Sequence, residues 1–191
     1  MLYVVDDMSG VTQLDDVVYV VCRESPIIKM FTADTLSPRG KDIHVRGMRK
    51  PRDIVACHQD RQLYIADLDL CIWRVSVDDH EKYVNWLAVT EVYTLSLTES
   101  RLLVTPYNKL CLRQYSTTDN KRPIKVKLPK YMIRLYHAAE TTFGSFVVGY
   151  QIKSQQHNKQ YVVSELFVLV IEIIINYHPI SRTLGGSFYY V

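Results

Sequence analysis

The chain has 191 residues, of which 48% are hydrophobic and 23% charged, with 7 Gly and 7 Pro. This composition excludes a disordered, collagenous or linker protein, because enough apolar side chains are present to offset the entropy lost on folding. The net charge of +3 at pH 7 is too small to indicate a polyanionic partner, so any basic surface must be local.

In chain order, the first predicted elements are pairs of short apolar runs that recur at a near-constant spacing. The first run of each pair lies at 18–22, 63–67, 102–106 and 145–149. The second run follows a few residues later in the first three pairs, at 27–31, 71–75 and 111–115. Each pair has the spacing of a β-hairpin, so Tyr19, Tyr64 and Leu103 are expected on equivalent second strands.

A further strand is predicted on either side of these hairpins. The preceding strands lie at 53–57, 92–97 and 132–136, and short alternating segments follow at 43–46 and 124–128. A four-stranded antiparallel unit of roughly 40 to 45 residues is typical of a β-propeller blade. The sequence therefore predicts an all-β fold, a β-propeller fragment of about three full four-stranded blades plus an irregular fourth. A β-sandwich is the alternative, since evenly spaced short strands also describe sandwiches.

We expect a single incomplete propeller domain over residues 1–191, with blades at about 1–46, 47–88, 89–126 and 127–191. Propellers close with typically four to eight blades, so closure with four blades is possible. A ring of about six blades would leave this chain as an open arc with two exposed sheet edges, so a fragment of a longer protein, with self-association through these edges, is the expectation. The apolar run 167–176 contains Glu172 and falls short of the roughly 20 residues of a membrane span. It is expected to be a buried strand, with an insertion foreign to the repeat as the alternative, and no membrane contact is predicted.

The second repeat contains Pro51-Arg52-Asp53-Ile54, the Leu-Tyr-Ile-Ala-Asp strand at 63–67 and the Cys-Ile-Trp-Arg-Val strand at 71–75. With these three segments it resembles the NHL-type repeat. The third repeat keeps only the apolar pattern, with Pro106 in place of the acidic residue, and residues 180–186 are similar to the end of an NHL-type blade. The resemblance implies a propeller that binds proteins, as NHL-repeat modules do in multidomain scaffolds and tripartite-motif ubiquitin ligases. The Gly-His and Trp-Asp marks of WD40 blades are absent from the sequence.

The cysteines and histidines favour neither a metal site nor a disulfide framework. Cys22, Cys57, Cys71 and Cys111 form no CxxC pair, and the histidines have no HxxxH spacing, so no metal and no cofactor are expected. Sparse cysteines, and an N-terminus without a basic segment before a long apolar stretch, predict a cytoplasmic protein. Cys71 and Cys111 match Ile27 in register and are expected to be buried, unreactive thiols.

The sequence does not predict an enzyme. It has no GxSxG nucleophile elbow and no Gly-rich phosphate-binding loop. Hydrolases built on propellers need acid and amide groups around a central ion, and Asp67 has no partner at the matching positions of the other repeats. A degenerate propeller hydrolase is therefore only an alternative.

Positive charge gathers where one predicted blade is linked to the next. The cations Arg46, Arg49, Lys50 and Arg52 lie around Pro51, and Lys125, Lys127 and Lys130 lie around Pro129, two repeats later. Equivalent links of a propeller run over the same rim, so these cations are expected to share one face.

The sequence therefore predicts a basic rim that attracts acidic peptides or phosphates, with salt-sensitive affinity. Its candidate residues are Arg46, Arg49, Lys50, Arg52, Lys127 and Lys130. The leading functional hypothesis is a non-catalytic module for protein–protein interaction, and RNA binding through the basic rim is the second. Ordinary solvated charges on an exposed edge are the alternative to both.

Overall fold

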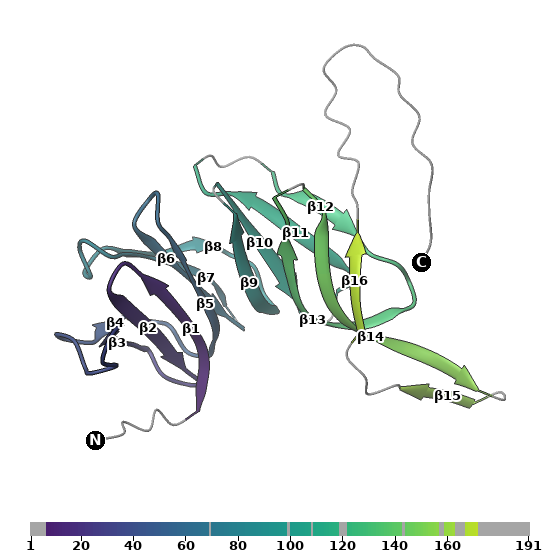
Figure 1. Cartoon of the computed structure of the whole chain (residues 1–191), viewed down its shortest axis with the longest axis horizontal. Helices are drawn as coiled ribbons and strands as arrows, with labels where there is room; N and C mark the ends of the chain where they lie inside the picture. Colours follow the sequence, from purple (N-terminus) through teal and green to yellow (C-terminus); the bar gives the residue numbers. More distant parts are fainter. Residues whose placement is uncertain are drawn as a thin grey trace, which may run out of the picture.

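The computed structural model describes residues 7–68, 70–98, 100–107, 109–118, 122–142, 144–156, 159–162 and 167–171. The regular structure of this part of the chain consists of strands, arranged in four antiparallel sheets that follow one another along the sequence (Figure 1). No helix that is long and apolar enough to cross a membrane occurs among these residues.

The first three sheets each contain four strands in sequence order. Sheet 1 comprises β1 (Met8–Leu14), β2 (Val17–Cys22), β3 (Ile27–Thr32) and β4 (Ile43–His44). Sheet 2 comprises β5 (Pro51–Cys57), β6 (Gln62–Asp67), β7 (Cys71–Ser76) and β8 (Tyr83–Leu87). Sheet 3 comprises β9 (Val92–Thr98), β10 (Arg101–Pro106), β11 (Cys111–Ser116) and β12 (Ile124–Lys127). Tyr19, Tyr64 and Leu103 each lie third in the second strand of their sheet, which confirms the predicted register of the three full blades.

The fourth sheet is irregular, as predicted. It contains β13 (Met132–Glu140), β14 (Phe146–Gln156), β15 (Lys159–Val162) and β16 (Phe167–Ile171). The first part of β14 pairs with β16, whereas its last four residues pair with β15. The β14–β15 hairpin therefore extends beyond the sheet (Figure 1). The apolar run beginning at Phe167 forms the paired strand β16, while its end at 172–176 and the blade-ending segment 180–186 lie outside the described residues.

The second strand of sheet 2 is apolar at nearly every position because this sheet lies between two others. In β6, Leu63 and Ile65 belong to the core between sheets 1 and 2. Tyr64 and Ala66, which alternate with them, belong to the core between sheets 2 and 3. A strand buried on both faces has a continuous apolar run in place of the alternation of a half-buried one, and this explains the recurring runs of the sequence.

The first strands of the four sheets, β1, β5, β9 and β13, form the inner strands of the propeller and pack side by side in that order. Gly10 on β1 lies where β5 passes closest, since a Cβ atom at this position would stand 2.8 Å from the Asp53 Cα. Each inner strand also has a β-bulge directly after its first residue, shown by a shift in its pairing with the second strand. The extra residues of the four bulges are Ser9, Arg52, Tyr93 and Ile133.

The antiparallel order of the strands defines two rims. The linkers 45–50, 88–91 and 128–131 and the turns between second and third strands lie at one rim, called the linker rim below. The turns between first and second strands and the loops between third and fourth strands lie at the opposite rim.

The two cysteines that were expected to be buried differ in their surroundings. Cys71 is fully buried, opposite Asp67 and within the core between sheets 1 and 2, as predicted. Cys111 is only half-buried, so the prediction was wrong for this residue. The reason is that Cys111 pairs across the sheet with the exposed Lys127 and follows the exposed Leu110.

Candidate binding rim

The carboxylate of Asp67 fixes the linker between sheets 1 and 2 through hydrogen bonds to its backbone. The Asp67 residue is fully buried, with 0% of its surface exposed. Its Oδ2 accepts hydrogen bonds from the Arg49 amide at 2.8 Å and from the Trp73 Nε1 at 3.2 Å. Its Oδ1 accepts a hydrogen bond of 3.1 Å from the Lys50 amide. A buried carboxylate that is fully hydrogen-bonded holds its donors in one geometry, so the backbone of Arg49 and Lys50 is preorganised.

Gly47 completes this arrangement at the preceding turn. Its φ of +99° lies in a region of backbone conformation that residues other than glycine rarely adopt. A Cβ atom at Gly47 would also stand 3.3 Å from the Trp73 ring. The linker therefore passes close over the indole that donates to Asp67.

The structure divides the predicted cations of the first linker into two groups. Arg46, Arg49 and Lys50 are exposed on the linker. Arg52 is half-buried, because it is the extra residue of the β5 bulge and lies on an inner strand. It lines a central cavity of about 500 Å³ formed by the inner strands, together with Asp53 and His137.

The second group of predicted cations lies two blades further along the same rim. Lys127 ends β12 and Lys130 lies in the linker that follows, and both are exposed. The linker between these two basic linkers carries Glu91, whose carboxylate forms an ion pair of 2.9 Å with Lys109. The rim therefore carries exposed basic side chains at two linkers, whereas Glu91 at the linker between them is paired with a lysine of the β10–β11 turn. This arrangement was not predicted from the sequence.

Backbone hydrogen bonds connect successive segments of the linker rim. The Leu68 amide donates to the Lys50 carbonyl at 3.1 Å, and the Glu91 amide donates to the Leu68 carbonyl at 2.8 Å. The Tyr107 amide in turn donates to the Glu91 carbonyl at 2.8 Å. Linkers and turns of neighbouring blades thus form one continuous, bonded surface.

Aromatic side chains accompany the charges on this surface. The Tyr93 and Tyr107 rings lie 5.2 Å apart, and the Arg134 guanidinium lies 5.5 Å from the centre of the Tyr107 ring. Tyr131, next to Lys130, is 49% exposed. Only Tyr131 could be recognised from the sequence, because Tyr107 and Arg134 belong to different repeats and meet only in the folded arc.

The central cavity contains the carboxylate of Asp53, both of whose oxygens already accept hydrogen bonds from backbone amides. Asp53 Oδ1 accepts a hydrogen bond of 2.9 Å from the Ile54 amide, and its Oδ2 accepts one of 2.8 Å from the Leu95 amide. Burial raises the pKa of Asp53, and these hydrogen bonds partly oppose the rise. No group of three or more His, Cys, Asp or Glu side chains that could hold a metal ion occurs in the described part of the chain.

Comparison with solved structures shows which known fold has this arrangement. No protein-family model matches the sequence, and no curated protein matches it. The hydrazine synthase of Kuenenia stuttgartiensis is similar with a TM-score of 0.62 at 12% identity, over 76% of this chain and 44% of that one. A chain of a nidogen–laminin complex is similar with a TM-score of 0.63 at 15% identity, over 83% of this chain and 65% of that one.

The chain has a β-propeller fold. It spans less than two thirds of the length of either of these two structures. At such low sequence identity the likeness concerns the fold alone.

Proposed function

We propose that this propeller is a non-catalytic binding module that holds an acidic protein segment against its linker rim. The observation that carries the proposal is the buried Asp67, which fixes the backbone of Arg49 and Lys50. A partner that meets these cations encounters a backbone already ordered, so less conformational entropy is lost on binding. The same carboxylate accepts three hydrogen bonds, so it serves structure and not acid–base chemistry.

The partner chemistry is inferred from charge and from the fold. Exposed Arg46 and Arg49 lie on one linker, and exposed Lys127 and Lys130 lie near another at the same rim. Two basic patches separated by Glu91 suit an extended segment with acidic side chains at both ends. A protein of similar fold was solved in a nidogen–laminin complex, which supports a protein as the partner.

RNA is the second candidate, and one observation favours it. Tyr131 is half exposed beside Lys130, and Arg134 stacks over Tyr107 nearby on the same rim. Single-stranded RNA is recognised by aromatic and guanidinium stacking together with phosphate contacts. Lys130 and Tyr131 on the third linker, with Arg134 and Tyr107 near it, supply both kinds of contact.

Three further properties belong to the same proposal. The chain is related to the NHL-type repeat, supported by the structural roles of Asp53 and Asp67 in its second blade. It forms one incomplete propeller domain, supported by inner strands that each pack on the next in sequence. It resides in a reducing, cytoplasmic environment, supported by the free thiols of Cys57, Cys71 and Cys111.

The test compares an acidic peptide and a single-stranded RNA as probes. Fluorescence anisotropy with labelled hexaglutamate and labelled oligouridine, between 50 and 200 mM salt, measures both affinities and their salt dependence. The double variant Arg46→Ala/Arg49→Ala is expected to weaken peptide binding and to reduce the salt slope by about one unit for each ion pair removed. A matched control, Lys29→Ala/Lys82→Ala, removes the same charge away from the linker rim.

The outcomes separate the hypotheses. Peptide binding that is stronger than RNA binding and sensitive to the double variant supports the protein-binding proposal. RNA binding that is stronger, and that Tyr131→Ala reduces, supports the second candidate. Equal effects of the double variant and its control would show that these cations are ordinary solvated charges.

A further inference from the structure

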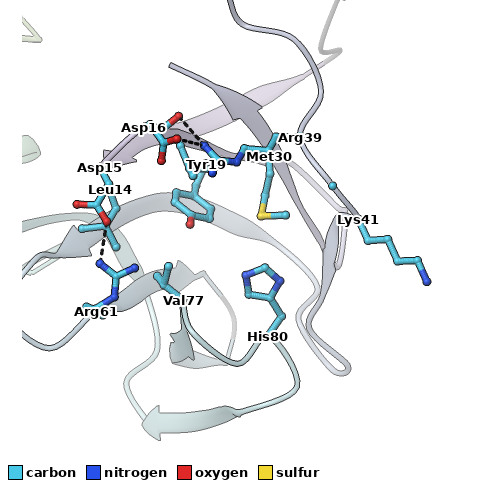
Figure 2. A pocket seen from close by; sticks show the side chains of 12 residues that line it. Leu14, Asp15, Asp16, Tyr19, Met30, Arg39, Lys41, Arg61, Val77 and His80 are labelled. Atoms are coloured by element: carbon cyan, nitrogen blue, oxygen red, sulfur yellow. Dashed lines mark hydrogen bonds and ion pairs between the residues drawn. The ribbon is translucent and has the colours of Figure 1, made fainter. Parts of the chain in front are cut away.

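A second cavity, of about 390 Å³, lies between sheets 1 and 2 at the rim opposite the basic linkers. Its walls come from the β1–β2 turn, the β3–β4 loop, the β5–β6 turn and the β7–β8 loop (Figure 2). Sites for small molecules in proteins commonly have volumes of about 300–1,000 Å³. The cavity is therefore large enough for a small ligand, and it is separate from the linker rim.

The floor of this cavity is apolar. Leu14, Tyr19, Met30 and Val77 line it, and Figure 2 shows the Tyr19 ring at its centre with Met30 beside it. Tyr19 is 1% exposed, and burial raises the pKa of its hydroxyl although Arg61 and Arg39 oppose the rise. The hydroxyl therefore stays neutral and the floor can support a ring or an aliphatic group.

The carboxylates around this floor are already matched by guanidinium groups. Asp15 accepts from the Arg61 Nη1 at 2.7 Å, and Asp78 accepts from the Arg61 Nε at 2.7 Å. Asp16 forms an ion pair with Arg39. A cationic ligand would have to displace one of these pairs.

The hydrogen-bond donors of the cavity are not all matched. Lys41 and His80 also line it, and neither forms an ion pair or a hydrogen bond with the described residues of the chain. Lys41 is exposed on the β3–β4 loop, directly after Gly40, whose φ is +68°. The cationic side chains of the cavity wall that pair with no carboxylate are thus those of Lys41 and His80. Figure 2 shows the Lys41 side chain extending away from the Tyr19 ring, and the His80 imidazole interacts electrostatically with the neighbouring Asp79.

We propose that this cavity binds a small organic anion. The carboxylate or phosphate group of the ligand is held by His80 and by Lys41, whose exposed side chain turns towards the mouth on binding, with Arg39 beside them, and its apolar part rests on Tyr19 and Met30. This proposal does not depend on the linker rim, because the cavity lies on the opposite rim and shares none of the residues proposed there.

Titration of the full chain with four small probes tests the proposal, with isothermal calorimetry as the readout. Phenyl phosphate and phenylacetate carry the anion and the ring, benzyl alcohol lacks the charge, and inorganic phosphate lacks the ring. The two aromatic anions are expected to bind at least about tenfold more tightly than either benzyl alcohol or inorganic phosphate, since both parts of the cavity contribute. The ratio between phenyl phosphate and phenylacetate identifies which anionic group the site prefers.

Two variants locate the binding. Lys41→Ala and His80→Ala are each expected to weaken binding of the preferred aromatic anion about tenfold, with an unchanged melting temperature. Lys82→Ala is the control, because Lys82 is exposed on the same rim but pairs with Asp79 outside the cavity. Absence of saturable binding by both aromatic anions, equal binding of benzyl alcohol, or unchanged affinity in both cavity variants would overturn the proposal.

Discussion

The Asp53 carboxylate on β5 accepts a hydrogen bond of 2.8 Å from the amide of Leu95 on β9, 42 residues later in the chain. Hydrogen bonds across the same separation of 42 residues join Ser9 to Pro51 and Thr94 to Tyr136. Each inner strand is thus bonded to the next through a side chain. The three bonds differ in chemistry and in their position along the strand, but each joins residues one repeat of 42 apart.

Replacement of Asp53 by Ala is expected to lower the free energy of unfolding by about 1–3 kcal/mol. Two buried backbone amides, those of Ile54 and Leu95, would lose their acceptor. Urea unfolding followed by tryptophan fluorescence measures the change. Asp42→Ala is the control, because Asp42 is exposed on a loop. Similar stabilities of the two variants would contradict the role given to Asp53.

The contribution of Asp53 is also expected to depend on pH. Burial raises the pKa of its carboxyl in the folded protein above the ordinary value of 3.8. The folded state therefore binds the proton more tightly than the unfolded state, and the stability contribution is largest below pH 3.8 and decreases as pH rises through the folded-state pKa. The difference in unfolding free energy between the wild type and Asp53→Ala should decrease over this range. A difference that increases with pH would show that ionisation of the carboxyl favours folding.

Asp67→Ala is expected to destabilise the protein by about 3 kcal/mol or more, because three donors lose a buried, charged acceptor. It should also change the emission of Trp73, whose indole donates to Asp67. In the absence of denaturant, where the variant is still folded, affinity for the acidic peptide should fall although no cation was removed. A loss of stability without any change in peptide affinity would separate the fold from the proposed preorganisation of the linker.

Gly10→Val tests the close approach of β1 and β5. The Cβ atom would stand 2.8 Å from the Asp53 Cα and 2.9 Å from the Ile54 backbone nitrogen, so two strands would have to move apart. We expect a loss of about 1–3 kcal/mol in thermal or urea unfolding. Val11→Ala, at a neighbouring side chain that is 53% exposed, should change stability by much less.

The thiols should differ in reactivity in the native state. Burial raises the pKa of Cys71 to about 12, so this thiol carries almost no thiolate near pH 8. Cys111 is half-buried and should react first with a disulfide reagent such as Ellman's reagent. Mass spectrometry of the labelled peptides identifies the order, and Cys111→Ser should remove the fastest phase. Early labelling of Cys71 would contradict its burial.

The sequence predicted the four-stranded units because strands covered on both faces leave a strong signal. Leu63, Tyr64 and Ile65 in succession are typical of such a strand, and the same pattern recurs in β2 and β10. The bulges of the inner strands leave no comparable signal. Their extra residues, Ser9, Arg52, Tyr93 and Ile133, share no side-chain chemistry, since what repeats is a backbone geometry.

The candidate site was predicted less completely for the same reason. Arg46 and Arg49 are exposed on the linker before β5, whereas Arg52 lines the central cavity at a bulge that the sequence does not reveal. The Glu91–Lys109 pair depends on a contact between a linker and a turn of the following blade. The alignment of the cysteines with Ile27 predicted burial correctly for Cys71 but not for Cys111, because Cys111 has the exposed Lys127 as its neighbour across the sheet.

The fourth strands, at the outer edge of the sheets, differ in length from blade to blade, whereas the bonds between inner strands keep nearly the same spacing. Strands β4, β8 and β12 have 2, 5 and 4 residues, while β1, β5 and β9 each have 7. Insertions or deletions at the outer edge therefore do not alter which inner residues meet. For protein engineering this makes the loop between β11 and β12 a suitable position for inserting a peptide tag or a fluorescent reporter, since it belongs neither to the linker rim nor to the second cavity. One residue added within an inner strand would instead misalign the inner faces of two blades.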